Sequence, residues 1–173
     1  MPHLIAALAV FLSVVAPPAP SPDVSEREVH CVVFVLDIAE SGEFKTTEPE
    51  CFDTPSEAVS WANLGVPLSA ESSPAIGGGT VAMSTFTLGT HYDGFNGSGS
   101  SISVVGSSCT GGYWNTTPSW DNRISSSYNG CARLRHYDYP NKGGQGENTY
   151  GAGTTDDLNS LNNRAESISY HSS

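Results

Sequence analysis

The chain has 173 residues and a formal net charge of −11, from 18 Asp and Glu against 7 Lys and Arg. The sequence shows no cluster of Lys and Arg, so we expect neither nucleic acid nor an anionic membrane surface as a partner. A cation or a basic protein surface fits this charge better. Most of the acidity lies between Asp23 and Glu71, and the chain from Phe86 onward is nearly balanced.

The first residues indicate a removable targeting segment. Leu4 to Ala16 is apolar except for Ser13, which matches the length of a signal-peptide core and is too short to span a bilayer. Residues 1–3, which precede it, carry no Lys or Arg, whereas a signal peptide usually begins with positive charge. The alternative is that this apolar segment is a buried N-terminal strand or helix. We expect residues 1–20 to be a signal peptide and the mature protein to be secreted and extracellular, without membrane association once the signal is removed.

Four cysteines in an exported chain indicate two disulfides. The cysteines are Cys31, Cys51, Cys109 and Cys131. Three pairings are possible, and proximity in the sequence favours Cys31–Cys51 and Cys109–Cys131, one bridge in each half. No Cys or His spacing is typical of a zinc site. Free buried thiols are the alternative if the chain is not exported.

The first half predicts a strand followed by a short helix. His30 to Ile38 is rich in β-branched residues, which favour a strand. Thr54 is a suitable helix cap, Pro55 suits the first turn, and Glu57 is an acid near the positive helix end. We expect residues 21–80 to form an acidic strand–helix unit, separated by the glycines at 77–79 from a second domain at residues 81–173.

The second half has the composition of an antiparallel sandwich. Gly, Ser, Asn and Thr dominate, and short strand-like segments alternate with turn signals. We expect strands near residues 81–88, 101–105, 133–137 and 167–170. Several tryptophans, tyrosines and phenylalanines in this half supply material for a core, which argues against disorder.

The second half also repeats itself. The tripeptide His91-Tyr92-Asp93 recurs as His136-Tyr137-Asp138, and Asp121-Asn122-Arg123 recurs as Asn162-Asn163-Arg164. Internal repetition at this spacing is typical of a duplicated supersecondary unit. Two units, at about residues 86–128 and 131–171, predict two four-stranded Greek keys that close on each other into one sandwich.

Each unit has an aromatic residue, then a glycine, then a later serine. These residues are Tyr92, Gly99 and Ser126 in the first unit, and Tyr137, Gly144 and Ser167 in the second. The pattern resembles the βγ-crystallin Greek key, whose aromatic corner folds over a hairpin that needs glycine at positive φ. The serine hydroxyl of that motif ties the hairpin down. The resemblance implies a mainly β protein, a βγ-crystallin-like double Greek key sandwich preceded here by a small strand–helix unit.

The same resemblance implies calcium loops before the two serines. The family loop has two Asx residues, two variable residues, then Ser or Thr, then Ser. The first loop is Asp121-Asn122-Arg123-Ile124-Ser125-Ser126, and the second is Asn162-Asn163-Arg164-Ala165-Glu166-Ser167. One ion takes the Arg123 carbonyl, the Ser125 hydroxyl and an Asx side chain of the other loop. Its partner uses the Arg164 carbonyl and position 166, where Glu departs from the pattern, so we expect a weak second site.

Calcium also suits these residues on chemical grounds, because it prefers carboxylate, amide, hydroxyl and carbonyl oxygens. The alternative is that the Asx residues act only as turn formers that bond their own backbone. His91 and His136 could be imagined as a zinc pair, although each more simply accompanies the aromatic of its motif. Neither HExxH, GxSxG nor a phosphate-binding loop occurs, so we do not expect an enzyme.

The function that these patterns favour is that of a secreted calcium-binding protein, non-catalytic, in which the ion stabilises the loops. The alternative is a secreted metalloproteinase inhibitor acting on an extracellular protease. Residues 31–66 resemble the N-terminal extension of secreted actinobacterial peptidase inhibitors, and residues 106–118, held by Cys109, would be the inhibitory loop. A small secreted toxin or cell-surface protein is a further alternative, and the fold alone does not decide among them.

Overall fold

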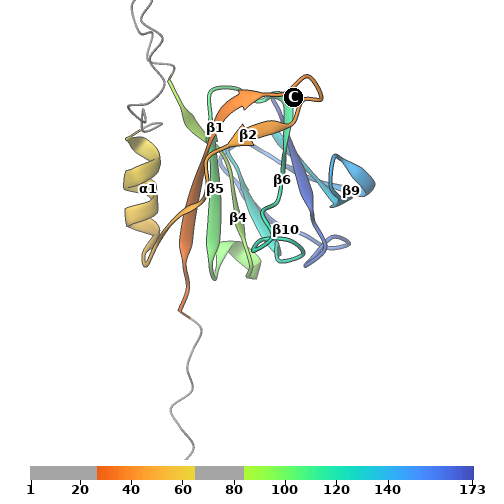
Figure 1. Ribbon diagram of the computed structural model, residues 1–173. Helices are drawn as coiled ribbons and strands as arrows, with labels where there is room; N and C mark the ends of the chain where they lie inside the picture. Colours follow the sequence, from red (N-terminus) through yellow and green to blue (C-terminus); the bar gives the residue numbers. More distant parts are fainter. Residues whose placement is uncertain (1–26, 65–83) are drawn as a thin grey trace, which may run out of the picture.

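The computed structural model describes residues 27–64 and 84–173. The predicted signal peptide and the glycines at 77–79 lie outside the described residues. Figure 1 shows two sheets facing each other, with one helix on the outer side of the larger sheet. None of the helices in the described ranges is long and apolar enough to cross a membrane.

The strands divide into a seven-stranded and a four-stranded sheet. The larger sheet has the order β10-β7-β4-β5-β1-β2, with β3 also paired to β1, and the smaller has the order β6-β11-β8-β9. The strands are β1 (His30–Ile38), β2 (Phe44–Thr46), β3 (Glu50–Phe52), β4 (Phe86–Tyr92), β5 (Ser101–Gly106), β6 (Thr110–Asn115), β7 (Ser126–Asn129), β8 (Arg133–Tyr139), β9 (Gly143–Tyr150), β10 (Thr155–Asp157) and β11 (Ser167–His171).

The two repeated units exchange one strand each. The first unit contributes β4, β5 and β7 to the larger sheet, but its third strand, β6, pairs with β11 of the second unit. The second unit contributes β8, β9 and β11 to the smaller sheet, while its third strand, β10, pairs with β7 of the first. Each unit therefore completes the sheet of the other. This arrangement confirms the predicted double Greek key sandwich.

The N-terminal strand belongs to the same sandwich. The predicted strand His30–Ile38 is confirmed with these bounds, and it pairs in parallel with β5. Cys31 and Val33 are buried in the core between the sheets, where Phe44 of β2 stacks on Tyr170 with ring centroids 5.5 Å apart. The structure thus differs from the expectation of a separate acidic unit. The run Cys31–Phe34 is apolar on both faces of β1 and is buried, whereas Asp37 lies at the exposed end of the strand.

The helix α1 (Pro55–Asn63) covers the outer side of the larger sheet. Its predicted cap is confirmed, because the backbone N–H of Glu57 donates to the hydroxyl of Thr54 at 3.3 Å. The buried helix residues Ala58 and Ala62 pack with residues of β1 and β5 in a second apolar cluster. That cluster contains Val32, Phe34, Ala58, Ala62 and Val105. The first half of β1, residues 30–34, is therefore covered on both faces, and its second half is exposed.

Both favoured disulfides are confirmed. Cys31–Cys51 joins the neighbouring strands β1 and β3. Cys109–Cys131 joins the β5–β6 turn to the connection between the two Greek key units. Each bridge closes a loop whose ends are about twenty residues apart, which should contribute about 3 kcal/mol by restricting the unfolded chain.

The segment expected to be an exposed inhibitory loop, residues 106–118, is mostly a strand. Strand β6 occupies its middle, and Tyr113 and Trp114 are only 3% and 2% exposed. Gly112 allows the ring of Phe44 to lie directly against the strand, where a Cβ atom would collide with it. The expectation of a free loop here was wrong because its glycines make room for core packing.

Candidate calcium site

Each hairpin corner is built as the sequence motif implies. Gly99 and Gly144 have φ values of +80° and +73°, a region that favours glycine. In the first unit, the Ser126 hydroxyl donates to the Gly94 carbonyl at 2.6 Å and accepts from the Gly97 N–H at 2.9 Å. The serine therefore ties its strand to both sides of the corner.

The second unit repeats this tie. The Ser167 hydroxyl donates to the Tyr139 carbonyl at 2.8 Å and accepts from the Lys142 N–H at 3.0 Å. Both serines are fully buried. The predicted role of these hydroxyls is confirmed in both units. The ties fix the ends of the loops at residues 121–126 and 162–167 against their corners.

The two loops lie side by side. The Asn163 N–H donates to the Ile124 carbonyl at 2.9 Å, and the Asn122 N–H approaches the Ala165 carbonyl at 3.4 Å. Asn122 and Asn163 adopt φ values of 56° and 54°, a left-handed conformation that asparagine tolerates better than most residues. The second Asx residue of each loop therefore lies against the other loop, as the resemblance implies.

Three oxygen atoms converge at the first loop. The Ser125 hydroxyl lies 2.9 Å from the Asp93 carbonyl oxygen and 3.2 Å from Oδ1 of Asn163. Ser125 comes from the first loop, Asp93 from the corner of the same unit, and Asn163 from the second loop. A hydroxyl has one proton, so it cannot donate fully to both acceptors at once. The cluster is rich in oxygen and short of donors, which suits a cation such as calcium.

The second loop differs at the equivalent place. There Oε1 of Glu166 accepts a hydrogen bond from Nδ2 of Asn122 at 3.1 Å. A calcium ligand at Asn122 would have to present Oδ1 instead. In the part of the chain that the structure describes, Oδ1 of Asn162 is buried without a hydrogen-bond partner. The corresponding Asp121 oxygen accepts from Thr116 at 2.9 Å. The second loop therefore also offers oxygen atoms as ligands, but the carboxylate of its fifth residue, Glu166, already accepts a hydrogen bond.

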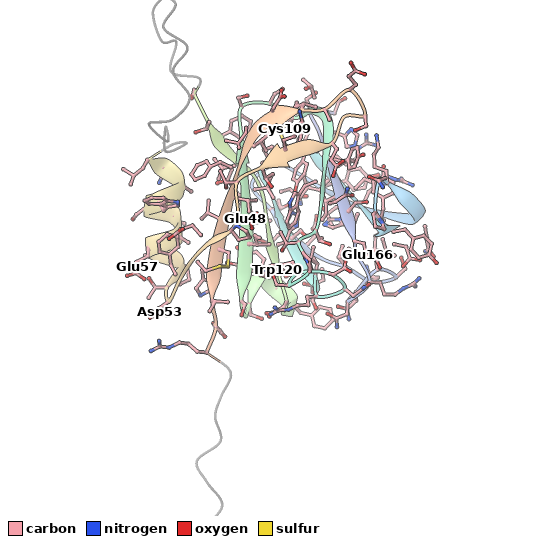
Figure 2. The ribbon with its side chains drawn as sticks, viewed as in Figure 1. Glu48, Asp53, Glu57, Cys109, Trp120 and Glu166 are labelled. Carbon is pink, nitrogen blue, oxygen red and sulfur yellow. A yellow bond between two sulfur atoms is a disulfide. The ribbon has the colours of Figure 1, made fainter. Side chains whose placement is uncertain are left out.

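Sequence reasoning did not identify the part that Asp93 and Asp138 play. Arg123 forms a salt bridge with the Asp93 carboxylate, with a 2.6 Å N–O distance, and its guanidinium lies 5.0 Å from the centroid of the Trp120 ring. Arg164 and Asp138 repeat the salt bridge at 2.7 Å. Trp120, just before the first loop, and Glu166, within the second, are labelled in Figure 2. Each aspartate ends a repeated His-Tyr-Asp tripeptide, which was the available signal.

The paired histidines lie in the core between the sheets. Ser127 Oγ lies 2.8 Å from Nδ1 of His91 and 2.9 Å from Nε2 of His136, and Nε2 of His91 lies 2.9 Å from the Tyr170 hydroxyl. Both histidines are 0% exposed. Burial lowers the pKa of His136 from 6.5 to about 4, against a smaller raising effect of Glu147, and lowers that of His91 well below 6.5. The two rings are thus neutral parts of a buried hydrogen-bond network.

Across residues 27–64 and 84–173, no group of three or more His, Cys, Asp or Glu side chains is placed to hold a metal ion. The oxygen cluster at Ser125 consists of a hydroxyl, a backbone carbonyl and an amide, so it belongs to a different kind of site. The carbonyls of Arg123 and Arg164 remain predicted ligands. Of the eight predicted loop residues, the structure brings Ser125 and Asn163 together, and separately Asn122 and Glu166.

No protein-family model matches the sequence, and no curated protein does. Among solved structures, the chain is similar to a crystal structure of a βγ-crystallin from an archaeon. The identity is 21%, over 47% of this chain and 94% of that chain, with a TM-score of 0.38. The strand exchange, the corner glycines and the serine ties described above define the fold on their own. It is a βγ-crystallin-like double Greek key sandwich, to which β1, β2 and β3 add one edge of the larger sheet.

Proposed function

We propose that this protein is a secreted, non-catalytic calcium-binding module. In this proposal, one calcium ion joins the first loop to the corner of its own unit and to the second loop. The observation that supports it most directly is the convergence of Ser125 Oγ, the Asp93 carbonyl and Asn163 Oδ1. These atoms come from three segments that are distant in the sequence, so an ion bound there would cross-link them.

The ligand chemistry sets the expected affinity. The three oxygens are neutral, and the Asp93 carboxylate is engaged by Arg123 rather than aimed at the cluster. Calcium affinity rises with the number of charged ligands, so a mainly neutral oxygen set favours moderate binding. The predicted Arg123 carbonyl and water would complete the coordination. Bound calcium would supply a structural cross-link that is absent from the unfolded chain.

Secretion and the lack of catalysis rest on separate observations. Two disulfides are compatible with an oxidising, extracellular environment. Ser127, which lies within hydrogen-bond distance of two histidines, is fully buried and out of reach of a substrate. An activated nucleophile needs an accessible position beside its base. These observations favour a binding protein. Inhibition through residues 106–118 loses its structural basis, because their middle is the buried strand β6.

Calorimetry with and without calcium tests the proposal. At free calcium ten times the dissociation constant, one site stabilises the fold by about 1.4 kcal/mol. For a chain of this size, that corresponds to an increase in the melting temperature of roughly 3–6 °C. Ser125→Ala should remove most of this increase, because it deletes the hydroxyl oxygen that lies beside both the Asp93 carbonyl and Asn163 Oδ1.

The matched control is Ser103→Ala, which removes a half-buried hydroxyl that bonds Thr90 on the larger sheet, away from the loops. This control should keep the full calcium response. A melting temperature unchanged by millimolar calcium would show that the Asx residues are only turn formers. A response that survives Ser125→Ala would place the ion elsewhere.

A further inference from the structure

Helix α1 leaves part of the outer face of the larger sheet uncovered. The helix covers the apolar part of this face, over β1 and β5, as Figure 1 shows. A groove of about 340 Å³ lies next to the helix, between its first half and the hairpin corner that follows β4. This volume falls within the range of small-molecule sites, about 300–1,000 Å³. The groove can therefore hold a small organic ligand.

The floor of the groove is polar. It consists of side chains from two neighbouring strands, and these are Thr90 and Tyr92 of β4 and Ser101 and Ser103 of β5. All four point to the outer face, because His91 and Ile102, which alternate with them along the strands, are buried in the core. Each of the four side chains carries a hydroxyl group. A ligand with several hydroxyl groups of its own matches such a floor.

The floor hydroxyls have hydrogen-bonding capacity left over. Thr90 Oγ1 and Ser103 Oγ lie 2.8 Å apart, and both side chains are half-buried. A hydroxyl has one proton to donate and two lone pairs that accept, so one mutual hydrogen bond does not satisfy the pair. Both donor and acceptor capacity remain for a ligand. A partner that donates and accepts, such as another hydroxyl group, satisfies both.

His30 contributes a further polar group from the start of β1. Its side chain is only 5% exposed, and it lines the groove. Nδ1 lies 2.9 Å from Ser101 Oγ, whereas Nε2 has no hydrogen-bond partner among residues 27–64 and 84–173. Nε2 is not one of the fully buried unpartnered atoms of these residues, so it reaches the groove surface. It is a donor in one tautomer and an acceptor in the other, and a ligand hydroxyl can pair with either.

The charge of the lining argues against an anion as the ligand. The carboxylate of Glu28 lines the groove, and no Lys or Arg is among the described residues that do so. The net charge of the chain, −11, adds to the repulsion of anions. A carboxylate only accepts hydrogen bonds, and its two oxygens can accept from neighbouring hydroxyl groups. Glu28 therefore suits the same kind of ligand as the floor does.

The backbone beneath the groove is already paired. Strand β4 pairs with β5 and β7, and β5 pairs with β4 and β1, so neither strand has a free edge. An extended peptide therefore cannot bind here by adding a strand to the sheet. Recognition has to come from the side chains, which favours a compact ligand.

The sides of the groove are less polar than its floor. Ala58 and Val59 of α1 line one side, and Gly97 and Gly99 of the corner line the other. A Cβ atom at Gly97 would come within 3.7 Å of the Tyr92 ring, so the corner packs against this aromatic side chain. The Tyr92 ring and the helix residues supply apolar contact beside the hydroxyl groups. A ring with apolar C–H faces and a polar rim would meet both kinds of surface.

We propose that this groove binds a carbohydrate through one or two of its sugar rings. The hydroxyl groups of the sugar bond the floor, Nε2 of His30 and the carboxylate of Glu28. The C–H faces of the ring contact Tyr92 and the apolar residues of α1. A ligand as small as one sugar ring binds weakly, so we expect dissociation constants in the millimolar range for single sugars. The proposal does not depend on calcium.

An NMR titration of the whole protein, followed at the assigned ring of His30, tests the proposal. The probes are glucose, galactose, mannose, N-acetylglucosamine, maltose and cellobiose in calcium-free buffer. Cyclohexanol, which has a ring but a single hydroxyl group, is the control for apolar binding, and inorganic sulfate is the control for anions. We expect saturable millimolar binding of at least one of the sugars and no saturable shift with either control.

Two variants with matched controls locate the site. Thr90→Val keeps the shape of the side chain but removes its hydroxyl, and should weaken sugar binding about two- to tenfold. Its control is Thr110→Val, because Thr110 is also a strand threonine whose hydroxyl bonds a nearby serine, but on the smaller sheet. Glu28→Gln should weaken binding at least about threefold, since a charged acceptor becomes neutral. Its control is Glu40→Gln, which removes the same charge beyond the far end of β1.

Three results would overturn the proposal. The first is the absence of a saturable shift at His30 with every sugar. The second is equal weakening by either control variant, which would place the sugar elsewhere. The third is binding of cyclohexanol as tight as that of the sugars, which would indicate an apolar groove without recognition of hydroxyl groups. The titrations contain no calcium, so none of these results bears on the proposed calcium site, whose failure would appear as an unchanged melting temperature.

Discussion

The loops at residues 121–126 and 162–167 have the same backbone but different chemistry. Both have a left-handed second Asx residue, an Arg–Asp salt bridge and a serine tied to the hairpin corner. They differ at the fifth position, where Ser125 approaches two further oxygens and Glu166 instead accepts from an amide. The conformation of the loop is thus set by the Asx residues and the serine. The fifth residue differs without changing these features, and under the calcium proposal it sets the ligand chemistry of each loop.

A similar contrast occurs in the core, between His91 of the first unit and His136 of the second. Both ring nitrogens of His91 lie within hydrogen-bond distance of protein hydroxyls. Among the described residues, Nδ1 of His136 has no hydrogen-bond partner. The two units again share a position but not its chemistry, which makes them internal controls for each other.

The largest expected effect is a loss of stability in mild acid. An unfolded histidine has a pKa of about 6.5, and that of folded His136 is about 4. Well above pH 6.5, His91 and His136 are neutral in both the folded and the unfolded state and contribute no pH dependence. Below it the unfolded chain takes up protons first, so the free energy of unfolding falls until about pH 4. His136 should account for about 3 kcal/mol of this loss.

Urea unfolding between pH 7 and pH 4 measures this effect. His136→Phe should remove one histidine's share of the slope, with a mild cost at pH 7, because one ring nitrogen already lacks a partner. His91→Phe should cost more at pH 7, since it removes two hydrogen bonds and leaves the buried Tyr170 hydroxyl without its partner, whereas Ser127 keeps His136. Equal costs at pH 7 would show that the contrast between the two histidines has no energetic meaning.

The serine ties should prove equivalent. Ser126→Ala and Ser167→Ala each remove two hydrogen bonds to partly buried backbone groups, at a cost of about 1–3 kcal/mol. Urea unfolding at pH 7 without calcium measures both. The control is Ser98→Ala, an exposed serine of the first corner that bonds only the nearby Phe95 carbonyl. A large effect in one unit and none in the other would contradict the equivalence of the two corners.

The smallest expected effect sharpens the contrast between the loops. Glu166→Ser recreates at the second loop the residue that the first loop has, so we expect a second calcium site. At ten times its dissociation constant, this site should add about 1.4 kcal/mol of stabilisation. Isothermal titration calorimetry should show the stoichiometry rising from one ion to two. If one ion still binds, a residue other than Glu166 limits the second loop.

The features that local sequence signals determine were predictable. The β-branched run at residues 30–38, the cap at Thr54 and the repeated loop motifs each depend on nearby residues, and the structure has each of them. The disulfides followed from proximity, and both formed between neighbouring strands or turns. The oxygen cluster was anticipated in part, through Ser125 and the Asx residue of the other loop.

The features that depend on long-range pairing were not predictable in the same way. Strands β6 and β9 are rich in glycine, which disfavours strands locally, and they form because β11 and β8 pair with them. The parallel pairing of β1 with β5 joins segments far apart in the chain. In the same way, only the register of β8 and β11 brings Arg133 beside His171.

The strand exchange also dictates when the protein can fold during its synthesis. Strand β6 leaves the ribosome before any of the second unit, but β11, the strand that pairs with it, is the last of all in chain order. Until β11 appears, the segment with Tyr113 and Trp114 has only a single bridge, to Glu43, in place of its strand partner, and such segments are prone to aggregate. The smaller sheet can therefore be completed only after β11 has been synthesised. Pairing β6 with β11 also closes a long loop, which has a high entropic cost. The emergence of β11, rather than growth of the first unit, should be the moment at which protease resistance appears.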